Sequence, residues 1–133
     1  MIAVMSGTDD SGDTAKWVVD VFDKNCPSRH THELVSGKWG SLALVALREG
    51  TYRFNALRRR VDGVSEKMLS QTLQGLERDG MVVREAQNTI PPHVEYSLTP
   101  LGRRVADRQF AIIELLEGEY DEIVAARERY DAK

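Results

Sequence analysis

Apolar residues recur at intervals of three and four along most of the chain, the spacing of one face of an α-helix. Pro27 interrupts this pattern, and Gly37, Gly50 and Gly80 each follow an apolar stretch, as residues that end helices often do. The pattern predicts helices over 13–25, 28–37, 38–50, 51–61, 65–80 and 103–131. The last stretch is either one long helix or two helices broken near Gly118.

The period changes to two after Gly80. "MVVREAQ" is rich in β-branched residues, "HVEYSLT" alternates apolar with polar positions, and the intervening "NTIPP" is a turn signal. These segments predict a β-hairpin, which is followed by Thr99 as N-cap and Pro100 at the first position of the last helix. The expected fold is mainly α with a small β-hairpin wing (α+β).

The helix over 65–80 has two different faces. At about 100° per residue, Leu69, Leu73 and Leu76 form one apolar stripe, and Ser65 is a favourable N-cap. The opposite face carries four polar, non-acidic side chains: Lys67, Gln71, Gln74 and Arg78. Such residues are common on solvated helices, but they are also the types that neutralise phosphates and read base edges in the major groove.

Other apolar positions are expected to form the core. The expected core residues of the middle helices and the hairpin are Trp39, Leu42, Leu44, Val45, Leu47, Phe54, Leu57 and Tyr96.

The net charge of −3 is unevenly distributed along the chain. Residues 38–108 carry twelve Lys/Arg against eight Asp/Glu, a net +4. Residues 1–37 have three against six and residues 109–133 have three against seven, so both ends are acidic. A polyanionic partner is therefore compatible with the middle segment alone.

The order helix, helix, hairpin is that of a winged helix-turn-helix, in which the second helix enters the DNA groove and the wing touches the adjacent backbone. We expect a tail over 1–12 and a single domain over 13–133 with a DNA-binding core at 37–102. The helices at 13–25 and 103–131 carry apolar stripes that a small core cannot cover. They predict dimerisation, with two recognition helices about one DNA turn apart, or a multiple of it.

Several function classes are disfavoured. No apolar run approaches the roughly 18 residues of a membrane helix, and the acidic N-terminus is no signal peptide, so a cytoplasmic location is expected. The chain has no phosphate-binding loop and no nucleophile elbow, which argues against an enzyme or a nucleotide cofactor. Cys26, His30 and His32 supply too few ligands, in poor register, for a zinc site.

Five blocks together resemble the HxlR family of bacterial transcription regulators. They are "CP" at 26–27, "GKW" at 37–39, "RFNAL" at 53–57, "VSEKMLSQTLQGLERDGMV" at 64–82 and "PPHVEYSLTPLG" at 91–102. The resemblance implies a homodimer that binds pseudo-palindromic promoter DNA. By position it implies DNA contacts from the recognition helix, the helix before it and the wing: Ser65, Lys67, Gln71, Arg53, Asn55, Gln87 and Asn88. Arg78 joins these candidates because it lies on the polar face of the same helix. Gln74 departs from the charged residue often found there and is a weaker candidate.

Cys26 is the only cysteine and matches the position of a cysteine that some HxlR-type regulators use to sense oxidants or electrophiles. Lys24, Arg29 and a helix start at Pro27 are expected to lower the pKa of its thiol. It can form a disulfide only with another molecule. The alternative is a small buried apolar residue.

The sequence thus predicts a sequence-specific, double-stranded-DNA-binding regulator, more often a repressor, with an oxidant or small-molecule effector left open. The alternative is a winged-helix module that binds protein and has no specific affinity for DNA.

Overall fold

The computed structural model describes residues 20–133. Its helices are α1 (Pro27–Ser36), α2 (Lys38–Leu47), α3 (Phe54–Arg60), α4 (Glu66–Arg78), α5 (Pro100–Gly118) and α6 (Tyr120–Asp131). Its strands are β1 (Tyr52–Arg53), β2 (Val82–Gln87) and β3 (His93–Leu98). The mainly α architecture with a hairpin is therefore confirmed. The two-helix alternative for the C-terminal segment holds, because the chain leaves helical geometry at Glu119.

The helix starts follow the local sequence signals. The Ser65 hydroxyl accepts a hydrogen bond from the backbone N–H of Met68 at 3.0 Å, and that of Thr99 accepts one from Gly102 at 3.0 Å. Each satisfies an amide that has no partner inside its helix. Gly63 and Gly80 flank α4 with φ of +91° and +79°, values that a residue with a side chain rarely adopts.

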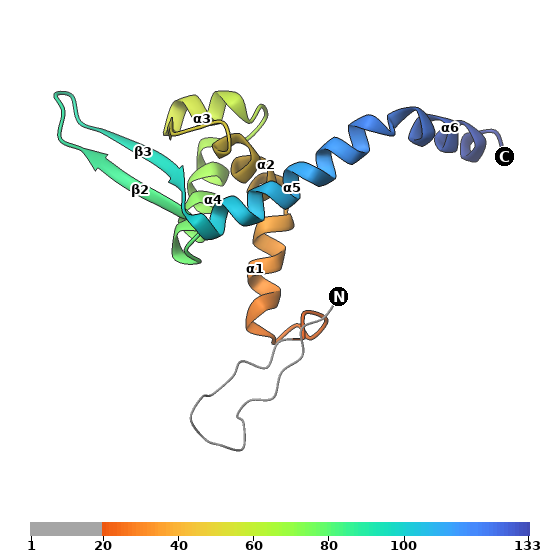
Figure 1. Cartoon of the computed structure of the whole chain (residues 1–133), viewed down its shortest axis with the longest axis horizontal. Helices are drawn as coiled ribbons and strands as arrows, with labels where there is room; N and C mark the ends of the chain where they lie inside the picture. Colours follow the sequence, from red (N-terminus) through yellow and green to blue (C-terminus); the bar gives the residue numbers. More distant parts are fainter. Residues whose placement is uncertain (1–19) are drawn as a thin grey trace, which may run out of the picture.

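The three strands form one antiparallel sheet in the order β1-β3-β2. The hairpin of β2 and β3 was expected, whereas β1 was not. Tyr52 and Arg53 of β1 pair with Tyr96 and Glu95 of β3. The hairpin projects from one side of the helical body, and the C-terminal end of α5 and α6 project from the other (Figure 1).

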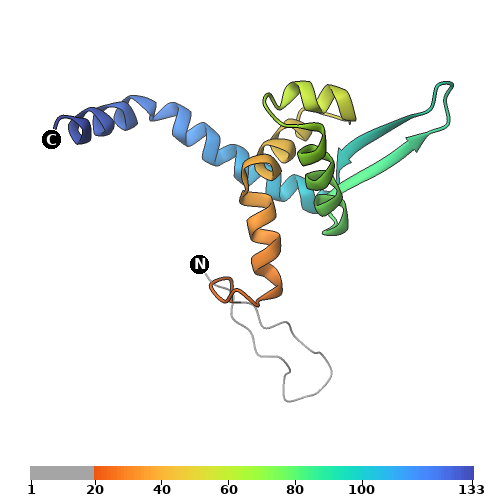
Figure 2. The same ribbon diagram turned by 180° about the vertical axis from the view of Figure 1, so that it is seen from behind.

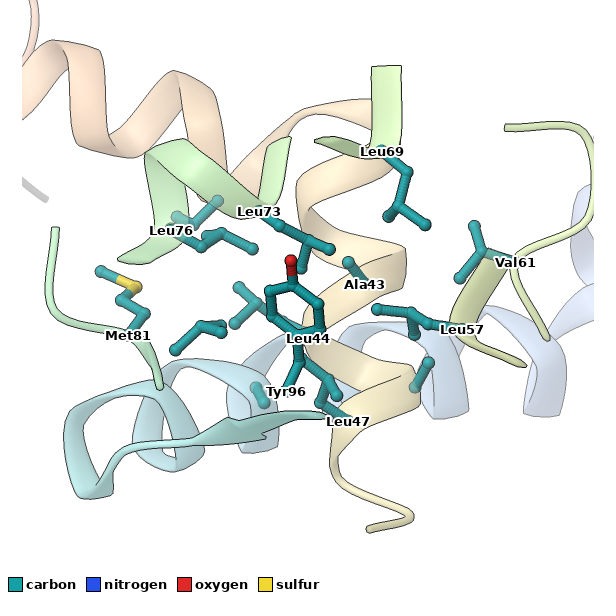
Figure 3. Close-up of a cluster of buried hydrophobic side chains, with 14 of the residues drawn as sticks. Ala43, Leu44, Leu47, Leu57, Val61, Leu69, Leu73, Leu76, Met81 and Tyr96 are labelled. Carbon is teal, nitrogen blue, oxygen red and sulfur yellow. The ribbon is translucent and has the colours of Figure 1, made fainter. Parts of the chain in front are cut away.

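One core holds the body together. Figure 3 shows side chains from α2, α3, α4 and β3 converging on it, with Leu44, Leu57 and Leu69 fully buried. Each large buried side chain removes enough apolar surface from water to contribute about 1.5–3 kcal/mol.

Three of the sequence expectations need correction. Leu42, expected in the core, is 39% exposed, and Trp39 and Val45 are only partly buried, because α2 packs one side against α4 and α5 and leaves the other open. The helix expected over 13–25 does not continue through 20–25, which form turns. Its first part, and the tail expected over 1–12, lie outside the described residues.

Within the described residues, no helix is long and apolar enough to cross a membrane.

Candidate nucleic-acid interface

The recognition candidate α4 is oriented by its leucine stripe. Leu69, Leu73 and Leu76 are at most 1% exposed and point into the core. The four polar residues of the opposite face, Lys67, Gln71, Gln74 and Arg78, are all exposed. None of the ion pairs found in residues 20–133 involves Lys67 or Arg78, so both charges remain available to a ligand.

The two flanks of α4 are covered by different neighbours. On one side lies α1: a Cβ at Gly75 would lie 3.1 Å from Leu34, and the Thr31 hydroxyl donates a hydrogen bond to Asp79 at 3.0 Å. On the other side lies the hairpin, across a hollow of about 390 Å³ that Ser70, Gln74 and Glu77 line together with Arg84 and Tyr96. Helix α4 thus lies between α1 and the hairpin, as seen from behind the molecule in Figure 2.

A second polar surface surrounds α3. One hollow of about 760 Å³ is lined by two arginines and two acids, Arg58, Arg59, Asp62 and Glu66, together with Asn55 and Ser65. A neighbouring hollow of about 440 Å³ shares Asn55 and Arg59, and adds Arg53 and His93. Arg53, Asn55 and Ser65, which are distant in the sequence, therefore lie along two adjoining hollows.

Arg60 is set apart from Arg58 and Arg59. Its Nε donates to Glu49 Oε1 at 2.8 Å and its Nη2 contacts Oε2 of the same carboxylate, while the Tyr52 hydroxyl donates to Oε1 at 2.6 Å. The hydrogen bonds from Arg60 and Tyr52 lower the pKa of Glu49 to about 2 and raise that of Arg60. Arg60 thus ties α3 to the end of α2.

Cys26 occupies the N-cap position of α1 and is 8% exposed. Its Sγ accepts a hydrogen bond from the Asp20 N–H at 3.1 Å and lies 3.1 Å from the Ser28 hydroxyl. The Ser28 hydroxyl is the main cause that lowers the pKa of the thiol, and backbone N–H groups at the helix start add to it. Lys24 is not among the causes, and the guanidinium of Arg29 is engaged by Glu33 instead.

Comparison with known proteins identifies the family of this chain. Residues 34–123 match the model of the HxlR-like helix-turn-helix family. The chain belongs to this family. It is a helix-turn-helix transcriptional regulator whose partner is DNA, and the members of its family are not enzymes.

The chain is similar to known transcriptional regulators both in sequence and in structure. The chain is 51% identical over 109 residues to an uncharacterized HTH-type transcriptional regulator, YtfH of Escherichia coli strain K12, covering 82% of this chain and 86% of YtfH. The solved putative regulator ytfH from Salmonella typhimurium matches with a TM-score of 0.76 at 50% identity, over 82% of this chain and 97% of that one. The redox regulator HypR in its oxidized form matches with a TM-score of 0.64 at 36% identity, over 70% and 96%.

The wing of this HxlR-type chain carries the remaining candidates. Gln87 is half-buried and donates to Glu95 at 3.4 Å, and Asn88 is exposed where the loop begins. Gln87 pairs in register with His93, which lines the same hollow as Arg53. The outer hairpin, residues 85–95, contains no lysine or arginine.

Two basic residues beside the site were absent from the sequence-based set. Arg59 lines both hollows of α3, and Arg84 faces the flank of α4 from β2. In the sequence, the run of three arginines at 58–60 marks Arg59 as a candidate. It does not distinguish Arg59 from Arg60, which pairs with Glu49. Arg84 had no local signal, because only the fold of the hairpin brings it to α4.

His30 and His32 are exposed, and residues 20–133 contain no group of three or more side chains arranged to hold a metal ion.

Proposed function

We propose that this HxlR-family protein binds a pseudo-palindromic operator as a homodimer, in a sequence-specific manner, and represses transcription in response to oxidants or electrophiles through Cys26. The observation that carries the proposal is the polar face of α4. It is the outward ridge of a helix whose opposite side is buried in the core, and neither of its two cations forms an ion pair with another residue of 20–133.

The residue types suit separate roles on DNA. Lys67 and Arg78 have donors for guanine or phosphate, and Gln71 can pair bidentately with adenine in the major groove. The hollows around α3 suit backbone phosphates, with Arg53, Arg59 and the amides that open α4 as donors. Further contacts are assigned to Asn55, Ser65, Gln87 and Asn88. Because the outer wing has no cation, its amide side chains would act by hydrogen bonding and not by charge.

The test replaces Lys67 and Gln71 together by alanine. Each base-reading side chain contributes about 1–3 kcal/mol of discrimination, so the double variant should lose at least roughly tenfold in operator affinity. The loss of one cation should also reduce the slope of log K against log salt by about one unit. Lys133→Ala, at the far end of the chain, is the control for loss of charge alone.

A folded double variant that binds operator as tightly as the wild type would remove the proposed role of α4. If the wild type binds no DNA fragment above non-specific levels, with a salt slope near zero, the protein-interaction module becomes the better reading.

The homodimer rests on the C-terminal arm, defined as residues 111–131. Its large apolar side chains are exposed: Ile112, Leu115, Leu116, Tyr120 and Tyr130. Leu115, Leu116, Ile123 and Ala126 line a shallow hollow across α5 and α6. Monomeric proteins rarely leave such a continuous apolar surface in water, and a two-fold partner would cover both copies at once. Leu116→Asp should shift the protein from dimer to monomer in sedimentation velocity, whereas Glu117→Gln should not.

Cys26 is the proposed switch. Its lowered thiol pKa favours the thiolate, which attacks hydrogen peroxide and, with uptake of one proton, gives a sulfenic acid and water. Condensation with a second thiol, from a partner protomer or a small thiol, then gives a disulfide and a second water. HypR, a structural relative, is described as a redox regulator and is solved in oxidized and reduced forms.

The switch is tested by titrating DNA from upstream of the gene with reduced and with peroxide-treated protein. Affinity should change on oxidation in the wild type and stay constant in Cys26→Ser. Equal DNA affinity of the reduced and the peroxide-treated wild type would mean that Cys26 acts only as a packing residue. Repression is tested with a promoter reporter, whose output should rise when the gene for the regulator is deleted.

A further inference from the structure

Helix α5 leaves the body of the protein after its second turn. Gly102 and Ala106 are buried, with Gly102 against the backbone of Met81, whereas Ile112 is already 53% exposed. From there the arm runs away from the body, as both views show (Figures 1 and 2). The angle at which the arm leaves is therefore set by contacts near residues 107–110.

Three side-chain contacts cluster at this exit. Arg48, directly after α2, donates from Nε to Asp107 Oδ1 at 2.8 Å. The same guanidinium lies 4.0 Å from the centre of the Phe110 ring. The amide of Gln109 donates to the carbonyl oxygen of Val35, in the last turn of α1, at 3.1 Å. A planar guanidinium that pairs and stacks at once restricts rotation more than a single contact would.

A small change in the angle at which α5 leaves the body produces a larger displacement farther along the arm. The eight residue steps from Phe110 to Gly118 span about 12 Å at 1.5 Å per residue. A rotation of about 10° at Phe110 then moves Gly118 by about 2 Å, and the two arms of a dimer would together move by about 4 Å. One base pair occupies about 3.4 Å of the DNA axis, so the shift is comparable with one step of half-site spacing.

We propose that Arg48, acting through Asp107 and Phe110, is a positioning residue that fixes the angle between the DNA-binding core and the arm, and thereby the half-site spacing that the dimer accepts. This inference rests on the proposed function. The alternative role for Arg48 is a contact with a DNA phosphate. Its guanidinium, however, already pairs with the Asp107 carboxylate and stacks on the Phe110 ring.

The experiment measures affinity for operators whose two half-sites are moved together or apart by one and two base pairs. Asp107→Asn removes the pair and a negative charge, whereas Phe110→Leu removes the ring and no charge. Arg108→Gln is the matched control, because Arg108 is an exposed neighbour whose side chain donates a hydrogen bond to the backbone oxygen of Arg104, within its own helix. Circular dichroism verifies that each variant is folded.

In the wild type, one spacing should bind at least tenfold better than its neighbours. In Asp107→Asn and Phe110→Leu this preference should fall to about threefold or move by one base pair, while Arg108→Gln keeps the wild-type profile. Spacing profiles of both variants that superimpose on the wild type would overturn the proposal. So would a uniform loss of affinity in Arg48→Gln at every spacing with a reduced salt slope, which marks a phosphate contact.

A second measurement separates this proposal from the proposed function. Spin labels at Glu77→Cys and Glu117→Cys, in a Cys26→Ser background, report the distance from α4 to the arm without DNA. The distance distribution should broaden in Asp107→Asn and Phe110→Leu. If the wild type binds no operator but the distribution broadens, the DNA function has failed while the positioning role of Arg48 stands. An unchanged distribution overturns that role directly.

Discussion

Replacing Gly102 by alanine should disrupt the junction between α5 and the start of β2. A Cβ at this position would lie 1.9 Å from the carbonyl oxygen of Met81 and 2.8 Å from its carbonyl carbon. Real Cβ contacts are essentially never shorter than 3.0 Å, so the two segments must separate by at least 1.1 Å. Both are backbone, and neither can move away by a change of rotamer.

The cost follows from the contacts around that junction. Overpacking a close contact costs about 1–3 kcal/mol. The displaced Met81 oxygen also accepts a hydrogen bond from the Thr99 N–H at 3.0 Å, and its loss adds about 1 kcal/mol. Alanine gains about 1 kcal/mol over glycine from its helix propensity. The net loss in free energy of unfolding is therefore about 1–3 kcal/mol, or a fall of roughly 4–12 °C in Tm.

Gly118→Ala is the matched control on the same helix, because a Cβ there meets nothing within 4 Å. Its helix propensity alone should raise stability, by up to about 1 kcal/mol. Thermal unfolding by circular dichroism, at one fixed protomer concentration, compares the three proteins. If Gly102→Ala unfolds at or above the wild-type temperature, the close approach at Met81 is wrong.

Two further predictions concern side-chain networks. Glu49→Gln should lower the urea midpoint at neutral pH, because it weakens the charged hydrogen bonds to Arg60 and Tyr52. The folded pKa of Glu49, about 2, lies below its ordinary 4.5, so the wild-type advantage should hold above pH 4.5 and vanish as pH falls towards 2. An advantage independent of pH would contradict this account. Ser28→Ala should raise the pKa of the Cys26 thiol, measured by ultraviolet absorbance of the thiolate, whereas Ser36→Ala, at the end of α1, should leave it unchanged. A pKa unchanged in Ser28→Ala would refute the role of the Ser28 hydroxyl.

The parts of the fold that the sequence predicts well are those decided by near neighbours. Ser65 and Thr99 cap their helices as their residue types suggest, because a cap needs only an amide three residues away. The leucine stripe of α4 is buried because its spacing matches the helical period. The polar face of α4 follows from the same geometry, so the main candidate surface was visible in the sequence.

The parts that were missed depend on distant pairing. The two residues of β1 are too few to alternate, and only their pairing with β3 makes them a strand. Leu42 lies in a helix that is apolar on nearly every side, so its period does not show which side is covered. Arg60 differs from Arg58 and Arg59 only because Glu49 lies within reach after the chain has turned.

The basic and acidic segments of the sequence form separate regions of the folded chain. The basic middle segment forms the body that carries the polar faces of α3 and α4, while residues 109–133, with a net charge of −4, form the end of α5 and all of α6. The arm points away from the body (Figure 1). A polyanion attracts the first surface and repels the second, within a Debye length of about 8–10 Å. The charge distribution therefore favours one orientation on DNA before any base is read, and it directs the acidic arm away from the DNA, where the proposed contact with a second copy would lie.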